Sequence, residues 1–525
     1  MSRQSTAHLF AALESGASKP FLHFEGRTTS WAELDERARS YAAALQQAGI
    51  ARGDRVAIVA DSCPELVVAL IGNFYVGAVH VPINTRYLAG EIAHILRDSS
   101  PAAILGDAEH AERIDEALAQ AGLDKALHIG IGEGAPGFHF DELLAAPPGE
   151  FVRPRDEDLA LIIYTSGTTG PSKGAMLSFA AVVANARALT GLWACSEHDR
   201  LLLCLPLFHV HGLCVGLIGA LIQGMTVLLE RRFSPALVVE RFGPGEHCGA
   251  NVFFAVPTMI AALVEHLDGN YDACRTLAHG RLFVSGSAPL SPALWERFVE
   301  MTDQRILERY GMTETLITLS NPYVGVRKPG AVGQPVPGCD AAVVDEQGNE
   351  LPVGETGELI VHSNGIMLGY WNDPKRSGEC FVIDREGERW FRTGDVARED
   401  EQGYFHIVGR SSVDIIKSGG FKIATRELED ALASHASVRE VAVVGMPDPT
   451  WGECIVACVV PSASAPAEPG ELLDQLIAHH QAQLADYKKP RALLVCEQLP
   501  RNALGKLQKH LLVEHLRDAG PSARR

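Results

Sequence analysis

Short apolar runs alternate with longer amphipathic stretches through the first half of the chain. Runs of four to six β-branched and leucine residues are typical of strands buried in a parallel sheet. They recur at residues 55–59, 78–83, 201–205, 225–229, 252–255 and 281–285. Between them, Ser30 with Glu33 three positions later is a capping-box signal for a helix reaching about residue 48. This alternation predicts an α/β protein with layered, mostly parallel sheets covered by helices.

The pattern changes in the last third of the chain. Residues 358–408 read as short strands joined by tight turns, which predicts a small antiparallel, barrel-like section. After Gly409 and Arg410 a helical stretch at 425–434 and a strand at 438–444 restart the alternation. We therefore expect a large N-terminal domain, residues 1–409, and a small, mobile α+β C-terminal domain, residues 410–525. Residues 461–470, rich in proline, alanine and serine, are expected to form a surface loop.

Composition narrows the class of protein. A length of 525 residues with 46% apolar and 21% charged residues indicates a globular protein of more than one domain. The net charge of −19 argues against a nucleic-acid partner, although it leaves local sites for small anions open. The 11 cysteines form no Cys-x-x-Cys pair, and no secretory signal or transmembrane segment is evident. We expect a cytoplasmic location; the sequence indicates nothing about oligomeric state.

The strongest chemical signal lies at residues 161–174, LIIYTSGTTGPSKG, where an apolar strand ends in hydroxyls, glycines and one lysine. Glycines let main-chain N–H groups face an anion, and hydroxyls and a lysine add donors. The spacing does not match the Walker-A phosphate loop. The candidate phosphate-binding residues are Thr165, Ser166, Gly167, Thr168, Thr169, Gly170 and Lys173.

This loop resembles the signature phosphate loop of the adenylate-forming superfamily, which includes acyl-CoA synthetases, peptide-synthetase adenylation domains and beetle luciferases. The resemblance continues in order over nearly the whole chain. It includes residues 308–315 (ERYGMTET), 392–395 (RTGD), 409–410 with 417–422 (GR and KSGGFK) and 500–506 (PRNALGK). One such segment could arise by chance; five at family spacing indicate membership.

The resemblance implies ATP, Mg²⁺ and CoA as cofactor and co-substrates, and a small-molecule carboxylic acid as substrate. Thr313 would contact the α-phosphate, and Glu314 with Thr169 would bind Mg²⁺. Lys506 would bridge the attacking carboxylate and the α-phosphate. The rest of the ATP site would comprise Gly286, Ser287, Ala288, Glu308, Arg309, Tyr310 and Gly311, with Asp395 and Arg410 on the ribose.

Two half-reactions are implied, since a carboxylate must first become an acyl adenylate before a thiol can displace AMP. The CoA residues would be Ser418, Gly419, Gly420 and Lys422. Because these lie in the same small domain as Lys506, the resemblance implies that this domain rotates between the two steps. The chain departs from many relatives at Ser411–Val413 after the hinge arginine, which leaves the identity of the pivot residue open.

The acyl pocket is expected beside a histidine-bearing loop at residues 205–213. Its two histidines lack a third ligand nearby in sequence, which disfavours a metal site. This loop and residues 281–288, 307–314, 320–323 and 413–420 resemble malonyl-CoA synthetases. Malonate's second carboxylate needs a buried cation, and we expect Arg281 to supply it. The candidate acyl residues are His209, Arg281, Ser285, Gly286 and Met312, with His209 also counted as catalytic.

Three alternatives stay open. The acid could be a neutral short-chain, medium-chain or aromatic acid. The acceptor could be the phosphopantetheine arm of a separate carrier protein, although residues 507–525 are too short for a carrier domain, which favours free CoA. A non-catalytic ATP-binding homologue is disfavoured, because Glu314, Asp395 and Lys506 are all present.

Overall fold

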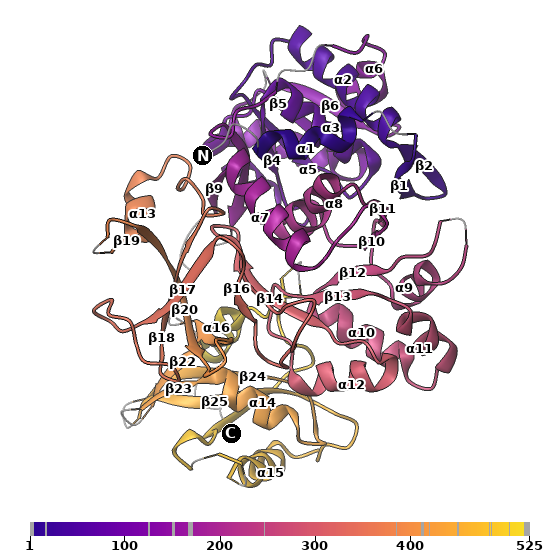
Figure 1. Cartoon of the computed structure of the whole chain (residues 1–525). Coiled ribbons are helices and arrows are strands. Elements are labelled where there is room, and N and C mark those ends of the chain that lie inside the picture. Colours follow the sequence, from indigo (N-terminus) through magenta and orange to yellow (C-terminus); the bar gives the residue numbers. More distant parts are fainter. Residues whose placement is uncertain are drawn as a thin grey trace.

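The computed structural model describes four sheets surrounded by helices (Figure 1). It describes residues 5–15, 18–123, 126–149, 153–165, 172–245, 247–384, 386–410, 414–418, 421–448, 451–481, 483–484, 486–502 and 505–518. The described helices are α1 (Ser5–Glu14), α2 (Trp31–Gln47), α3 (Pro64–Val76), α4 (Ala89–Ser99), α5 (Ala111–Ala121), α6 (Phe140–Leu143), α7 (Phe179–Leu192), α8 (Gly219–Gln223), α9 (Pro235–Phe242), α10 (Pro257–Leu267), α11 (Tyr271–Ala278), α12 (Pro292–Thr302), α13 (Pro374–Glu379), α14 (Thr425–Ala433), α15 (Pro469–Gln481) and α16 (Lys509–Asp518), with shorter turns η1 (Ala108–His110), η2 (His211–Ile218) and η3 (Asp486–Lys488). No described helix is long and apolar enough to cross a membrane.

The first sheet has seven strands, six of them mutually parallel, and lies in the indigo-to-purple part of Figure 1. Its order is β7 (Phe138–His139), β6 (Leu127–Ile131), β5 (Ala103–Asp107), β3 (Arg55–Val59), β4 (Val79–Pro82), β8 (Leu159–Thr165) and the antiparallel β9 (Lys173–Ser178). The central strands are buried on both faces, which explains their unbroken apolar sequences.

The second sheet has nine strands, and its centre is parallel. Its order is β16 (Gln334–Pro335), β15 (Leu316–Ser320), β14 (Leu307–Met312), β13 (Leu282–Ser285), β12 (Val252–Ala255), β10 (Arg200–Leu203), β11 (Thr226–Leu229), β1 (Pro20–Phe24) and β2 (Arg27–Ser30). The predicted strands of both sheets are confirmed to within two residues. The helix predicted after Ser30 is also confirmed, and the Ser30 hydroxyl accepts the Glu33 N–H at 3.1 Å.

The third sheet confirms the predicted antiparallel section. Its order is β17 (Cys339–Val344), β18 (Thr356–Ser363), β20 (Arg389–Glu399) and β19 (Phe381–Ile383), and β21 (Phe405–Arg410) also pairs with β20. Asp395 of β20 lies opposite Arg410 of β21 in this ladder. The sheet therefore ends where the boundary between the two domains was predicted.

The fourth sheet lies at the C-terminal end of the chain, in the lower part of Figure 1. Its order is β23 (Phe421–Ala424), β22 (Ile415–Ser418), β25 (Gly452–Pro461) and β24 (Val438–Asp448), with β26 (Ala492–Val495) parallel to β25. Leu512 and Leu516 of α16 pack into one apolar cluster of this sheet, whereas α14 and α15 contribute to another. Both clusters consist of residues beyond position 415, so this part has cores of its own.

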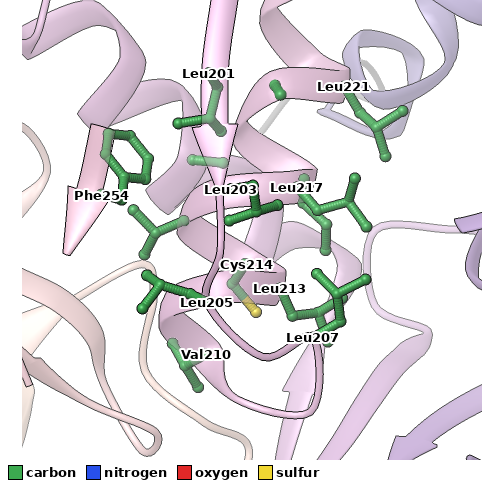
Figure 2. Close-up of a cluster of buried hydrophobic side chains, with 14 of the residues drawn as sticks. Leu201, Leu203, Leu205, Leu207, Val210, Leu213, Cys214, Leu217, Leu221 and Phe254 are labelled. Atoms are coloured by element: carbon green, nitrogen blue, oxygen red, sulfur yellow. The ribbon is translucent and has the colours of Figure 1, made fainter. Parts of the chain in front are cut away.

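Apolar side chains form the core around the histidine-bearing loop, residues 205–213 (Figure 2). Leu201 and Leu203 of β10 lie in the main core with Leu213 and Leu217 of η2, an eight-residue π-helical segment. Leu205, Leu207 and Val210 continue this packing through the connecting loop. π-helical turns are uncommon and often occur at functional sites. The π-helical segment η2 therefore indicates that the histidine-bearing loop belongs to such a site.

Candidate active site

Four neighbouring parallel strands, β10, β12, β13 and β14, direct their carboxyl ends to the same edge of the nine-stranded sheet. Ligands of α/β proteins bind outside this edge. The residues that follow these strands include His209 after β10, Gly286 after β13 and Thr313 after β14. The topology therefore brings together candidates that are about 100 residues apart in the sequence.

The residues predicted to bind phosphate and Mg²⁺ come from the two large sheets. Thr165 ends β8 and pairs with Lys173, the first residue of β9. The Thr165 hydroxyl lies 3.5 Å from Glu314 Oε1, and the Tyr370 hydroxyl donates to the same oxygen at 2.9 Å. Lys173 Nζ lies 5.5 Å from the centre of the Tyr370 ring. Glu314 is therefore held at the start of the phosphate loop, and oxygen ligands of this kind suit Mg²⁺.

Five of the predicted phosphate-loop residues lie outside the described residues. They are Ser166, Gly167, Thr168, Thr169 and Gly170. The structure places only the two ends of the loop, Thr165 and Lys173, so the phosphate contacts of the loop and the Thr169 metal role stay predictions.

Tyr310 and Asp395, the residues predicted to bind adenine and ribose, lie side by side. The Tyr310 hydroxyl donates to Asp395 Oδ2 at 2.5 Å, and the Asp395 carboxylate is buried. Ser287 adopts a positive φ of 70° in the loop 286–288, a conformation that displays main-chain groups. A side chain at Gly311 is excluded, because its Cβ would lie 2.0 Å from the Leu316 carbonyl oxygen. The structure thus brings the predicted adenine and ribose residues together; the Arg410 side chain lies outside the described residues.

A buried cation, Arg309, lies beside residues predicted to bind the acyl substrate. The Arg309 side chain is only 4% exposed, and its Nε and Nη2 have no hydrogen-bond partner among the described residues. A Cβ on Gly286 would lie 2.5 Å from the Arg309 guanidinium carbon, so glycine is required for this approach. Burying an unpaired charge is costly, and Arg309 is therefore suited to receive an anion.

Two neutral histidines adjoin Arg309. Burial lowers the pKa of His209 to about 4, with further lowering by the charges of Arg309 and Lys506. Burial and Arg309 also lower the pKa of His211 well below its usual range. His211 Nε2 and Ser285 Oγ are buried without a partner among the described residues. Buried polar groups of this kind are normally hydrogen-bonded, so the unpartnered atoms of Arg309, His211 and Ser285 suit a polar or anionic ligand.

The expected role of Arg281 is corrected by the structure. Its guanidinium makes two hydrogen bonds to Asp199, Nε to Oδ1 at 2.8 Å and Nη2 to Oδ2 at 2.9 Å, and donates to the Trp193 carbonyl at 3.0 Å. Arg281 precedes β13, whereas Ser285 and Gly286 lie at its other end, about 13 Å away at 3.3 Å per residue. It stabilises the opposite edge of the sheet, and the cation beside the acyl residues is Arg309.

The C-terminal domain brings Lys506 toward this site. Lys506 N–H donates to Asn502 Oδ1 at 3.0 Å, which shapes the loop around it. The preceding Gly505 has a φ of 75°, and a Cβ there would lie 2.5 Å from Thr258 Oγ1 at the start of α10. The charge of Lys506 contributes to lowering the pKa of His209, after burial and Arg309.

The CoA candidates are only partly described. Ser418 ends β22 and is buried, with its Oγ unpartnered among the described residues. Gly419, Gly420 and the side chain of Lys422 lie outside the described residues. The CoA assignment therefore stays a prediction.

The sequence analysis missed Tyr370, Thr258 and the acyl-site position of His211. Tyr370 carries no local signal, since it reaches Glu314 only because its segment bridges to Ala175 of β9. His211 could have been found, because the His-x-His spacing in one loop places both rings near the same pocket. Met312 packs against the main core, next to Thr313.

Comparisons with known proteins match this geometry. The family model described as AMP-binding enzyme matches residues 9–371, and the model of the AMP-binding enzyme C-terminal domain matches residues 427–506. A malonate–CoA ligase of Arabidopsis thaliana is 34% identical over 89% of this chain and 79% of its own length. ATP-bound MatB from Rhodopseudomonas palustris superposes with a TM-score of 0.89 at 34% identity, covering 98% of this chain and 99% of that one. A malonyl-CoA ligase complex with methylmalonyl-CoA and AMP gives 0.67 at 36% identity, covering 94% and 100%.

Proposed function

Because the chain belongs to the AMP-binding enzyme family, we propose that it is an AMP-forming malonate–CoA ligase. The observation that carries the choice of acid is Arg309, a buried guanidinium with unpartnered donors among the described residues, beside His209 and Gly286. A dicarboxylic acid activated at one end carries its second carboxylate into this pocket, where the cation compensates for lost hydration. The malonate–CoA ligases among the relatives support the same substrate.

The chemistry proceeds in two steps. In the first, a malonate oxygen attacks the α-phosphorus of ATP and pyrophosphate leaves. Lys506 and Thr313 neutralise charge that grows in the transition state, while Tyr310 and Asp395 hold the nucleoside. Mg²⁺, when bound at Glu314, neutralises phosphate charge. In the second step the sulfur of CoA attacks the acyl carbon, AMP leaves with the bonding electron pair, and the thiol proton passes to solvent.

Rotation of the C-terminal domain between these steps is part of the proposal. The close approach of Gly505 to Thr258 supports an arrangement that suits adenylation. The better superposition on the ATP-bound relative than on the product complex, at nearly equal identity, supports different domain arrangements in the two steps. We place the boundary at residues 409–410. The cytoplasmic location also stays a proposal.

The function is tested by a panel of acids with ATP and CoA. We expect the highest kcat/KM for malonate, or for malonate and methylmalonate, ahead of acetate, octanoate and benzoate. Each thioester formed should release one AMP and one pyrophosphate and no ADP. A preference for a neutral acid would exclude the malonate assignment, and acyl transfer to a phosphopantetheinylated carrier but not to CoA would indicate carrier loading.

Glu314→Gln should weaken adenylation by at least about tenfold, the lower end of the loss when a group supporting a metal is removed. It should also raise the Mg²⁺ concentration needed for half-maximal rate, because a neutral amide is a poorer ligand than a carboxylate for a hard cation. The measurement is a Mg²⁺ titration of pyrophosphate release. The exposed Glu296→Gln on α12 is the matched control and should leave the titration unchanged. An unchanged titration for Glu314→Gln would remove Glu314 from the metal site.

A further inference from the structure

A second contact joins the C-terminal domain to the large domain, away from Lys506. Arg426, the second residue of α14, donates from Nη2 to the main-chain carbonyl of Leu290 at 3.1 Å. Its Nε donates to Asp430 one turn along the same helix at 2.8 Å, which holds the side chain in this direction. In Figure 1 α14 accordingly lies beside α12, which starts two residues after Leu290.

Leu290 belongs to the segment that carries the nucleotide loop. It is buried and follows the loop 286–288 by two residues. The Glu308 carboxylate accepts the Gly330 N–H at 3.0 Å, and the Leu290 N–H lies close enough to lower the pKa of Glu308. Glu308 directly precedes Arg309 in β14. The segment that Arg426 contacts therefore follows the nucleotide loop in the chain and lies near Glu308, the residue before Arg309.

Arg426 acts on Glu308 through its charge, in addition to its hydrogen bond to Leu290. Burial raises the pKa of Glu308 to about 7, and Arg426 and the two main-chain donors lower it. The Arg426 guanidinium thus approaches a buried acid of the large domain while it donates to Leu290. A rigid domain attached at a hinge needs further contacts to define its orientation, and Arg426 supplies one in addition to the Gly505–Thr258 contact.

We propose that Arg426 is a positioning residue. By donating a hydrogen bond to the Leu290 carbonyl, it holds the C-terminal domain in the orientation that suits adenylation. The proposal rests on the proposed two-step function. When the domain turns for thioester formation, Arg426 leaves Leu290, so the contact serves the first step alone. Arg426 touches neither substrate; it acts through the placement of Lys506.

The proposal is tested by measuring the two half-reactions separately in the Arg426→Ala variant. Malonyl-AMP formation from ATP should fall roughly ten- to a hundredfold, the range for one hydrogen bond to a charged group. Conversion of preformed malonyl-AMP and CoA to malonyl-CoA should change less than about twofold, because that step does not use the contact. Arg426→Lys, which keeps a cationic donor, should recover part of the loss.

Arg439→Ala is the matched control. Arg439 also donates to a main-chain carbonyl, that of Glu497 at 3.2 Å, but within the C-terminal domain. It should leave both half-reactions unchanged. Equal losses in both half-reactions of Arg426→Ala, no loss in either, or the same loss in Arg439→Ala would overturn the proposal. The premise is tested separately in the wild type: if thioester formation does not release AMP and pyrophosphate, the proposed two-step function fails whatever Arg426 does.

Discussion

Lys506→Ala is expected to reduce malonyl-AMP formation by about 10²–10³, the loss typical of removing one preorganised donor from a transition state. The Lys506 loop is placed for this by the close approach of Gly505 to Thr258 at the start of α10. Charge on the attacking and α-phosphate oxygens is greatest during adenylation, so the effect should be confined to that step. Pyrophosphate release and thioester formation from supplied malonyl-AMP measure the two steps separately.

Lys489→Ala provides the control for this experiment. Lys489 belongs to the same domain, but its ammonium pairs with Asp486 at 2.9 Å on the surface. Both half-reactions should be unaffected in this variant. A folded Lys506→Ala enzyme that loses both half-reactions equally would contradict the assigned role.

Arg309→Leu should lower kcat/KM for malonate by roughly 30-fold to several thousandfold. Removing one partner of a buried charged pair costs about 2–5 kcal/mol, and each 1.4 kcal/mol is a factor of about ten. Acids without a second carboxylate, such as butyrate, should be used no worse, since the variant no longer buries an unpaired guanidinium. The quantity to measure is the ratio of kcat/KM for malonate to that for butyrate in wild type and variant.

Arg281→Lys distinguishes a selectivity effect from a structural one. Arg281 pairs with Asp199, whose side chain is only 4% exposed, so the substitution weakens a buried two-bond contact and should lower stability. The ratio of malonate to butyrate use should stay at the wild-type value. A ratio that changes in Arg281→Lys and not in Arg309→Leu would reverse the assignment made from the structure.

The sequence by itself determined the order of the elements and the chemistry of the nucleotide site. Apolar runs such as residues 252–255 became buried parallel strands, because a continuous apolar segment of that length is satisfied on both faces only inside such a sheet. Resemblance of the motifs at residues 308–315 and 392–395 to the adenylate-forming superfamily identified Glu314 and Asp395 without any coordinates. The structure then placed both within hydrogen-bond distance of predicted site residues, Thr165 and Tyr310.

Only the tertiary structure decided which arginine serves the acyl pocket. Arg281 precedes β13 and Arg309 lies within β14 of the same sheet, and the sequence favoured Arg281 because its strand leads into the nucleotide loop. The decisive facts are long-range: Asp199 lies across the sheet edge from Arg281 and takes up its guanidinium, whereas Arg309 finds no such acid among the described residues. Pairing of this kind depends on how strands about 80 residues apart are placed side by side. The same applies to Arg426 and Leu290, 136 residues apart, which only the docking of the two domains brings into contact.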